Sequence, residues 1–219
     1  MTTTSSAESP RTPGDARPTV VLASENAGKL RELRALVGDL AEVRDLSAFG
    51  LTLPEETGET FAENARAKAE YVSVATGLVA LADDSGLEVD ALDGLPGVRT
   101  ARYAGEGASD AANRQKLLAA LAGVSGEDRG ARFVSFVAVS APGMETMLFA
   151  GTCEGAIALE ERGEGGFGYD SLFLLPSGQT MAEISADEKN AISHRGQAMR
   201  AALPGLRAAI AGWTESEVP

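Results

Sequence analysis

The sequence predicts a mixed α/β fold: an elongated mixed sheet with flanking helices. Short β-branched, apolar runs alternate along the chain with segments of helical spacing. Two long strand-like segments, Arg132–Ser140 and Thr146–Leu159, are separated by the turn residues Ala141-Pro142-Gly143, which indicates a hairpin. An antiparallel pair of this length argues against a purely parallel, doubly wound sheet.

The chain length suits one domain with a large core. Its 219 residues are 44% hydrophobic and 23% charged, as in ordinary globular proteins. Residues 1–18 contain no Val, Ile, Leu or aromatic side chain and are rich in Ser, Thr and Pro, so we expect a disordered N-terminal tail. We therefore expect a single domain over residues 19–212, followed by a C-terminal tail at 213–219.

The first elements predicted are a strand and a helix joined by a polar loop. Thr19–Ala23 is β-branched and apolar, and leucines at 30, 33 and 36 give Lys29–Val37 a helical spacing. The capping-box residues Thr60 and Glu63 predict the start of a second helix, Phe61–Thr76. The apolar run Leu78–Ala82 predicts a buried strand that ends in the segment Asp83-Asp84-Ser85-Gly86.

The later elements follow the same signals. Ser109 is a candidate cap for a helix that continues to about Leu121, and Leu172–Leu175 predicts a short strand. A second capping box at Ser185 and Glu188 opens a helical region, with a possible break where Ser193 caps the chain again. We expect Pro204 to end that region.

Charge and cysteine content exclude several classes of function. The net charge of −13 disfavours binding to duplex nucleic acid, which usually requires a basic face. The single cysteine, Cys153, excludes an internal disulfide framework and a multi-cysteine zinc site. No apolar run approaches the ~18 residues of a membrane span, and no secretory h-region is present. We expect a cytoplasmic protein without a membrane partner.

Two familiar nucleotide-binding patterns fail on inspection. Gly28-Lys29 lacks both the upstream glycine and the following Ser or Thr of a phosphate-binding P-loop. The segment from Gly163 to Gly168 matches G-x-G-x-x-G literally, but a strand pattern follows it. A dinucleotide-binding fingerprint requires a helix at that place, so this interpretation is disfavoured.

Three polar clusters could carry chemistry, and each has an ordinary structural alternative. Residues 24–29 lie at a strand-to-helix turn, where free N–H groups and Lys29 could bind an anion, or could form a plain loop. The acidic segments 83–86 and 55–58 could supply carboxylates to Mg²⁺, or could be turns. Adjacent carboxylates on a strand point to opposite faces, so only one of Asp83 and Asp84 should face a cleft.

The third cluster contains Lys189, His194 and Arg195, within seven residues. His194 is the only histidine, so a two-histidine metal site is excluded, and its alternative is a helix-surface position. A Ser-His-Asp triad remains formally possible, but no G-x-S-x-G elbow supports it. We interpret Cys153 as structural.

Taken together, these segments resemble the inosine triphosphate pyrophosphatase family over about residues 20–203. The matching segments, in chain order, are Ser24–Lys29, Glu55–Gly58 with Thr60-Phe61 and Glu63–Ala65, Ala82–Leu87, Pro96-Gly97 with Ala101–Tyr103, Gly165–Asp170 and Ser193–Arg195. Two positions depart from the family pattern: Thr100 replaces a Ser, and Ser171 replaces a Pro.

The resemblance implies two lobes around a central cleft, a homodimer, Mg²⁺ as cofactor and a small-molecule nucleotide substrate. It implies that Ser24, Glu25, Asn26, Ala27, Gly28 and Lys29 cradle a triphosphate, and that Asp84 is the catalytic base and a metal ligand. Glu55 or Glu56 would also bind Mg²⁺, and Ser85 would contact substrate. The base and phosphate pocket would contain Phe167, Gly168, Tyr169, Asp170, Lys189, His194 and Arg195.

The implied reaction is hydrolysis of deaminated purine nucleoside triphosphates (ITP, dITP, XTP) to the monophosphate and pyrophosphate. In this scheme Lys29, Lys189 and the metal neutralise the leaving group, and Asp84 accepts the proton of the attacking water. Two alternatives remain open: a pyrophosphatase for other modified nucleotides, and a nucleotide-binding regulator that has lost catalysis.

Overall fold

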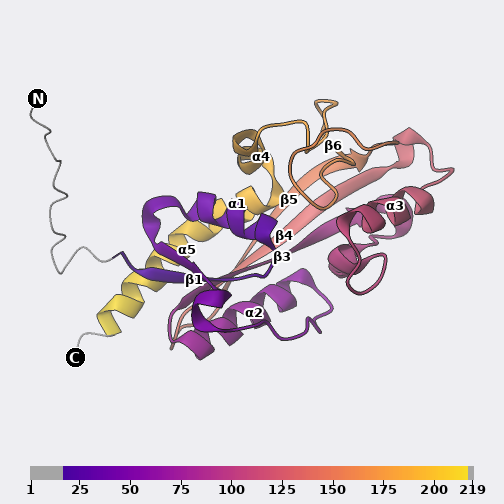
Figure 1. Cartoon of the computed structure of the whole chain (residues 1–219). Coiled ribbons are helices and arrows are strands. Elements are labelled where there is room, and N and C mark those ends of the chain that lie inside the picture. The colour runs from indigo at the N-terminus through magenta and orange to yellow at the C-terminus, as the bar shows by residue number, and fades with distance from the viewer. Residues whose placement is uncertain (1–16, 217–219) are drawn as a thin grey trace, which may run out of the picture.

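The computed structural model describes residues 17–216, which form a six-stranded mixed sheet with helices on both faces (Figure 1). The strand order is β2-β1-β3-β4-β5-β6. The strands are β1 (Thr19–Ala23), β2 (Glu42–Asp45), β3 (Val79–Val89), β4 (Gly130–Ser140), β5 (Met147–Ile157) and β6 (Phe173–Leu174). The helices are α1 (Ala27–Val37), α2 (Phe61–Thr76), α3 (Asp110–Ala120), α4 (Ala186–Ile192) and α5 (His194–Ser216).

The sheet combines parallel and antiparallel pairs. Strand β1 pairs in parallel with β2 and β3, whereas β3, β4 and β5 are antiparallel and 11 residues long each. The predicted hairpin of two long strands is β4 and β5. The mixed α/β fold class predicted from the sequence is therefore confirmed.

Side-chain alternation along the strands builds a core on each face of one half of the sheet. Val20 and Leu22 pack toward α1 and α5, while Val21 and Ala23 pack toward α2. Alanines dominate the α2 side, including Ala65 of that helix, which allows the helix to approach the sheet closely. Helices α1 and α5 thus cover one face and α2 the other (Figure 1).

A third apolar cluster fills the other half of the molecule, around α3 and β6. It includes Leu117, Leu121, Phe133, Ile157 and Phe173, all buried. Figure 1 shows α3 beside the far ends of the long strands, well away from β1 and α2. The long strands β3, β4 and β5 join the two halves, which gives the expected two lobes on a common sheet.

Most predicted helix starts are confirmed by their caps. Thr60 and Glu63 form a complete capping box, as do Ser185 and Glu188. The side chain of Ser109 accepts a hydrogen bond from the Ala112 N–H at the start of α3. The break between α4 and α5 also lies where it was expected, at Ser193.

Two expectations about element ends were wrong. Strand β3 does not end in the segment 83–86 but continues through Gly86 to Val89. A Cβ on Gly86 would lie 2.4 Å from Thr100 Oγ1 and 2.6 Å from the Gly97 carbonyl oxygen, so this glycine allows a crossing segment to pack on the strand rather than forming a turn. Helix α5 passes through Pro204, because its buried face packs along β4 and β5 on both sides of the proline.

Of the two expected tails, residues 17–18 and 213–216 belong to the described part of the chain. Residues 1–16 of the expected N-terminal tail and residues 217–219 lie outside the described part of the chain. Residues 213–216, expected to be tail, belong to helix α5. The short strand β2 was not expected. In residues 17–216, no helix is long and apolar enough to cross a membrane.

Candidate functional site

A cavity of about 440 Å³ lies between the two halves of the molecule and collects the predicted site residues. Of these, only Ala27 and Gly28 do not line it. The predicted residues that do are Ser24, Glu25, Asn26, Lys29, Glu55, Glu56, Asp84, Ser85, Phe167, Gly168, Tyr169, Asp170, Lys189, His194 and Arg195. Segments far apart in sequence therefore meet at one site.

The turn before α1 differs from the expected cradle of free N–H groups. Asn26 caps the helix, and its Oδ1 accepts hydrogen bonds from the N–H groups of Gly28 (2.9 Å) and Lys29 (3.0 Å). Gly28 packs against Phe167, whose ring would lie 2.6 Å from a Cβ at that position. This turn therefore offers an anion mainly the Lys29 ammonium and the loop side chains.

Asp83 and Asp84 point to opposite faces of β3, as their adjacency predicts. Asp83 is buried toward α1 and α5, where it pairs with Lys29 Nζ (2.9 Å) and Arg195 Nη2 (3.3 Å) and accepts a hydrogen bond from Ser135 Oγ (2.5 Å). Burial opposes ionisation of Asp83, but Arg195 and Lys29 hold its pKa well below the ordinary value. Asp83 is therefore a fixed anion that orients two cations.

Asp84 faces α2 and shares a lysine with Glu56. Lys68 Nζ lies 2.7 Å from Asp84 Oδ1 and 2.9 Å from Glu56 Oε1, and it donates a third hydrogen bond to the Asp83 carbonyl oxygen (3.0 Å). Burial raises the pKa of the Asp84 carboxyl, and Lys68 and Lys29 offset only part of that rise. Asp84 is thus a buried carboxylate whose pKa lies closer to neutrality, as suits a general base.

Lys68 was missed by the sequence analysis, although a signal for it existed. It lies on the apolar stripe of α2, three residues after Ala65 and four before Val72, and it is buried. A lysine on the core face of a helix needs a partner carboxylate, so its position alone suggests a site.

The carboxylates of the pocket suit a Mg²⁺ ion whose coordination shell is completed by oxygen atoms of the substrate. Among residues 17–216, no cluster of three or more His, Cys, Asp or Glu side chains is arranged to hold a metal by protein groups alone. However, Glu56 and Asp84 both reach Lys68 Nζ, and Glu55 lines the same end of the pocket. Mg²⁺ commonly takes one or two carboxylates together with phosphate oxygens and water, so these residues fit it.

The other end of the pocket centres on Phe167. Lys189 Nζ lies 4.8 Å from the centroid of this ring, and the Arg195 guanidinium lies 5.7 Å from it. Lys189 pairs with Asp170 (2.5 Å) and with Glu32 of α1 (2.8 Å), so it is held among the aromatic residues rather than beside Asp84. Glu32 is a second residue that the sequence analysis missed.

Arg195 and His194 each carry a buried nitrogen that has no hydrogen-bond partner within residues 17–216. Arg195 Nη1 donates to Glu32, and its Nη2 donates to Ser85 Oγ (2.7 Å), yet its Nε has no hydrogen-bond partner among the described residues. The same holds for His194 Nδ1, although His194 stacks on Phe133 with centroids 4.7 Å apart. Burial and the nearby Arg195 hold the pKa of His194 well below its ordinary value, so the ring is neutral.

The glycine-rich segment forms a loop against the pocket and does not open a helix, as its sequence context predicted. Gly166 and Gly168 both have positive φ, and Phe167 between them lines the pocket. The Tyr169 hydroxyl donates to the Thr100 carbonyl oxygen (2.9 Å), and Thr100 Oγ1 accepts from the Leu87 N–H (2.8 Å). The hydroxyl of Thr100 makes a contact that a serine would also provide.

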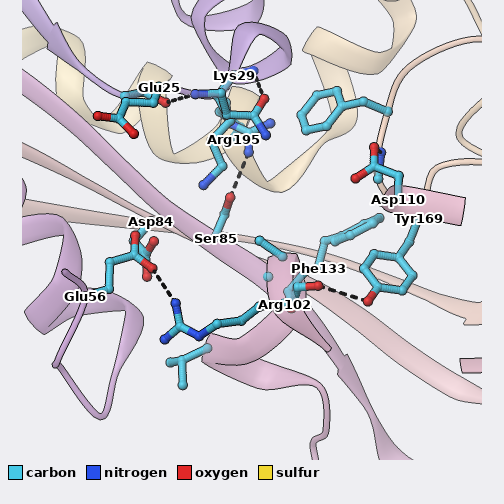
Figure 2. A pocket seen from close by; sticks show the side chains of 18 of the residues that line it. Glu25, Lys29, Glu56, Asp84, Ser85, Arg102, Asp110, Phe133, Tyr169 and Arg195 are labelled. Atoms are coloured by element: carbon cyan, nitrogen blue, oxygen red, sulfur yellow. Dashed lines mark hydrogen bonds and ion pairs between the residues drawn. The ribbon is translucent and has the colours of Figure 1, made fainter. Parts of the chain in front are cut away.

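The pocket is therefore divided into two chemically different ends. Figure 2 shows Glu25, Glu56 and Asp84 at one side of the pocket and the rings of Phe133 and Tyr169 at the other. The first end concentrates carboxylates and lysines, and the second combines aromatic faces with buried hydrogen-bonding groups. Such a site suits a ligand with an anionic part and a flat, polar ring.

This fold and this two-ended pocket place the chain among α/β proteins with a cleft for a nucleotide-like ligand. A family model described as the Ham1 family matches residues 20–204. The chain therefore belongs to the Ham1 family, which confirms the resemblance found from its motifs.

Similar proteins cover more than four-fifths of the chain. A "dITP/XTP pyrophosphatase" of Bacillus licheniformis is 51% identical over 184 residues, covering 83% of this chain and 94% of the relative. A protein of the same name from Haemophilus influenzae is 50% identical, covering 82% and 94%. Among solved structures, a HAM1 protein from Coxiella burnetii has a TM-score of 0.77 at 45% identity and covers 88% of this chain and 100% of that one.

Proposed function

We propose that this protein hydrolyses deaminated purine nucleoside triphosphates (ITP, dITP and XTP) to the monophosphate and pyrophosphate. The observation that carries the proposal is the division of one pocket into a carboxylate-and-lysine end and an aromatic end with unpaired buried nitrogens. The names of relatives about 50% identical to the chain support the same activity.

The residues at the first end suit attack of water on the α-phosphorus. Asp84 accepts the proton of the water as its oxygen bonds to phosphorus, and the bond from phosphorus to the bridging oxygen breaks to release pyrophosphate. Lys29 and Lys68 neutralise charge on the phosphates. We assign this task to Lys68 rather than Lys189, because Lys68 contacts Asp84 and Lys189 lies against Phe167.

The charge of the pocket supports a requirement for Mg²⁺. Its lining contains six carboxylates and five Lys or Arg side chains, and His194 is neutral. A triphosphate brings about four negative charges into this environment, so a divalent cation is needed to offset them. Glu56 and Asp84, with Glu55 nearby, would hold the ion, which would polarise the phosphates and acidify bound water.

The aromatic end suits recognition of a purine with a carbonyl at C6. The Arg195 Nε–H is a permanent donor, and neutral His194 has one donor and one acceptor nitrogen. Adenine presents an amino group at C6, which would leave a buried donor unpaired. Stacking of the purine on Phe167 would complete the site.

We further propose a homodimer in the cytoplasm, acting on a small nucleotide and not on nucleic acid. Exposed apolar side chains such as Val74 and Leu159 are available for a subunit contact. Cys153 is buried, and burial raises the pKa of its thiol, as suits an unreactive thiol in a reducing compartment. Light scattering with and without reductant should give the same dimer mass.

Pyrophosphate release from ITP, dITP, XTP, GTP and ATP, each with and without Mg²⁺, tests the proposal. We expect the first three to be cleaved well above GTP, with ATP weakest, and no activity after chelation. A preference for modified pyrimidine triphosphates would favour the first alternative, a pyrophosphatase for other nucleotides. Tight binding of ITP without pyrophosphate release would favour a regulator.

A further inference from the structure

Two side chains of α3 hold the backbone of the loop that carries Phe167. Asp110 Oδ2 accepts a hydrogen bond from the Gly168 N–H (2.8 Å), and Arg114 Nη1 donates to the Gly168 carbonyl oxygen (2.9 Å). Asp110 and Arg114 are four residues apart on one helix, so they lie on the same face. Figure 2 shows Asp110 beside this loop at the aromatic end of the pocket.

These two hydrogen bonds hold the loop at a residue whose backbone conformation affects its neighbours. Gly168 has a φ of +61°, and Phe167, Tyr169 and Asp170 around it all line the pocket. A rotation of the Gly168 backbone would move the Phe167 ring and the Tyr169 side chain together. Charged partners strengthen both hydrogen bonds, because one uses a carboxylate and the other a guanidinium.

Arg114 is itself anchored from the opposite side. Its Nε lies 2.9 Å from Glu161 Oε2, and the same carboxylate oxygen accepts a hydrogen bond from Ser171 Oγ (3.1 Å). Arg114 and Glu161 therefore tie both ends of the segment from Gly168 to Ser171 to one helix. The Arg114 side chain is 19% exposed, which limits solvent competition for its bond to Gly168, whereas its ion-pair partner Glu161 is 40% exposed.

The same helix also holds a second wall of the pocket. The buried Asn113 accepts from the Ala104 N–H (2.7 Å) and donates to the Ala101 carbonyl oxygen (3.0 Å), and Ala101 lines the pocket. Helix α3 thus sets the spacing between two walls without placing its own apolar face in the site.

We propose that Asp110 and Arg114 are positioning residues that set base selectivity through the Gly168 backbone. This inference rests on the proposed function for its kinetic readout, but not for its structural one. Removing Arg114 should release the loop, weaken base recognition and leave the Asp84 end of the pocket in place.

The test compares Arg114→Ala with Gln115→Ala, an exposed neighbour on the same helix. We expect Arg114→Ala to raise KM for ITP about tenfold, the scale of one or two charge-assisted hydrogen bonds, with a much smaller change in kcat. The ratio of kcat/KM for ITP to kcat/KM for ATP should fall. Arg114→Lys should restore part of the loss, and Asp110→Asn, which keeps an acceptor, should be milder than Asp110→Ala.

Hydrogen exchange without nucleotide separates failure of this proposal from failure of the proposed function. Amide hydrogens in peptides that cover residues 163–172 should exchange faster in Arg114→Ala than in wild type. Their exchange rate should be unchanged in Gln115→Ala, and neither result depends on which substrate the protein takes. Unchanged exchange in Arg114→Ala would overturn the positioning role. So would equal loss of kcat/KM for ITP and ATP with an intact fold. Wild-type protein that fails to cleave ITP would contradict only the proposed function.

Discussion

Two neighbouring aspartates occupy opposite environments because a strand turns successive side chains to opposite faces. Asp83 meets two cations and a serine hydroxyl, and its pKa is held well below the ordinary range although burial opposes this. Asp84 meets one shared lysine, and burial raises its pKa. The first carboxylate is therefore a permanent counter-ion, and the second is able to exchange a proton.

Asp84→Asn keeps the size of the side chain and removes the proton acceptor. We expect turnover on ITP to fall at least about a hundredfold, the usual scale for loss of a general base, with the fold intact because Glu56 still pairs with Lys68. In the unmodified protein, kcat/KM for ITP, which reports the free enzyme, should fall as pH drops through the raised pKa of Asp84, so its acid limb should lie above the ordinary aspartate value of about 3.9. Pyrophosphate release measured against pH checks both points, and a variant that retains turnover would contradict the assignment.

Asp83→Asn should instead damage stability. The change leaves Lys29 and Arg195 without their common carboxylate in a buried site, and breaking such a pair costs about 3–5 kcal/mol. Because the folded-state pKa of Asp83 is depressed, its contribution is present above the unfolded value of about 3.9 and is lost as pH falls below it. Denaturant unfolding should show a large difference from wild type at pH 7 that narrows toward pH 3. A difference that is constant with pH would contradict the linkage.

At the scale of elements, helix α2 contributes chemistry through one residue on its core face. Lys68→Gln removes a cation that lowers the pKa of Asp84, so the acid limb of kcat/KM for ITP should move to higher pH as turnover falls. Arg66→Gln is the matched control, because Arg66 pairs only with Glu70 at the surface of the same helix among the contacts described. An unmoved acid limb in Lys68→Gln would show that Lys68 acts on substrate alone.

Sequence patterns located the elements better than their ends. Caps at Thr60, Ser109 and Ser185 were predictable because each places a side-chain oxygen at a helix start. The continuation of β3 through Gly86 was not predictable, because a glycine that permits close packing looks the same in sequence as one that forms a turn. Helix α5 continued through Pro204 because packing outweighed local preference.

For the candidate site too, residues in local sequence motifs could be predicted, whereas residues defined by long-range contacts could not. Motifs located fifteen lining residues, because the family pattern spans both ends of the pocket. The sequence did not reveal Lys68 and Glu32 as site residues. Each lies within a helix, and each takes part in the site only through ion pairs with residues distant in sequence. Two of the N–H groups expected to be free at the start of α1, those of Gly28 and Lys29, are not free, because the Asn26 side chain accepts hydrogen bonds from both.

At the scale of the whole molecule, one pocket joins two lobes with different tasks. The lobe containing β1 and α2 supplies Lys29, Lys68 and Asp84, and the Phe167 loop rests on α3 in the other lobe. Helix α5, which supplies Arg195, packs along the strands that connect them. Changes at the phosphate end should therefore affect all nucleotides alike, whereas changes at the base end should alter selectivity.

Lys29→Ala and Arg195→Ala test whether the phosphate end and the base end have separate tasks. Both side chains pair with Asp83, so each variant removes one cation from the same carboxylate. Lys29→Ala should lower kcat/KM for ITP and ATP by the same factor, because both nucleotides carry the same triphosphate. Arg195→Ala should lower the value for ITP far more than for ATP, because the proposed role of the unpaired Nε–H is to donate to the C6 carbonyl, which ATP lacks. The ratio of ITP to ATP efficiency, measured for both variants, decides the matter. Equal loss on both nucleotides in Arg195→Ala would assign that residue to phosphate binding or to the fold, and the separation of tasks between the lobes would be wrong.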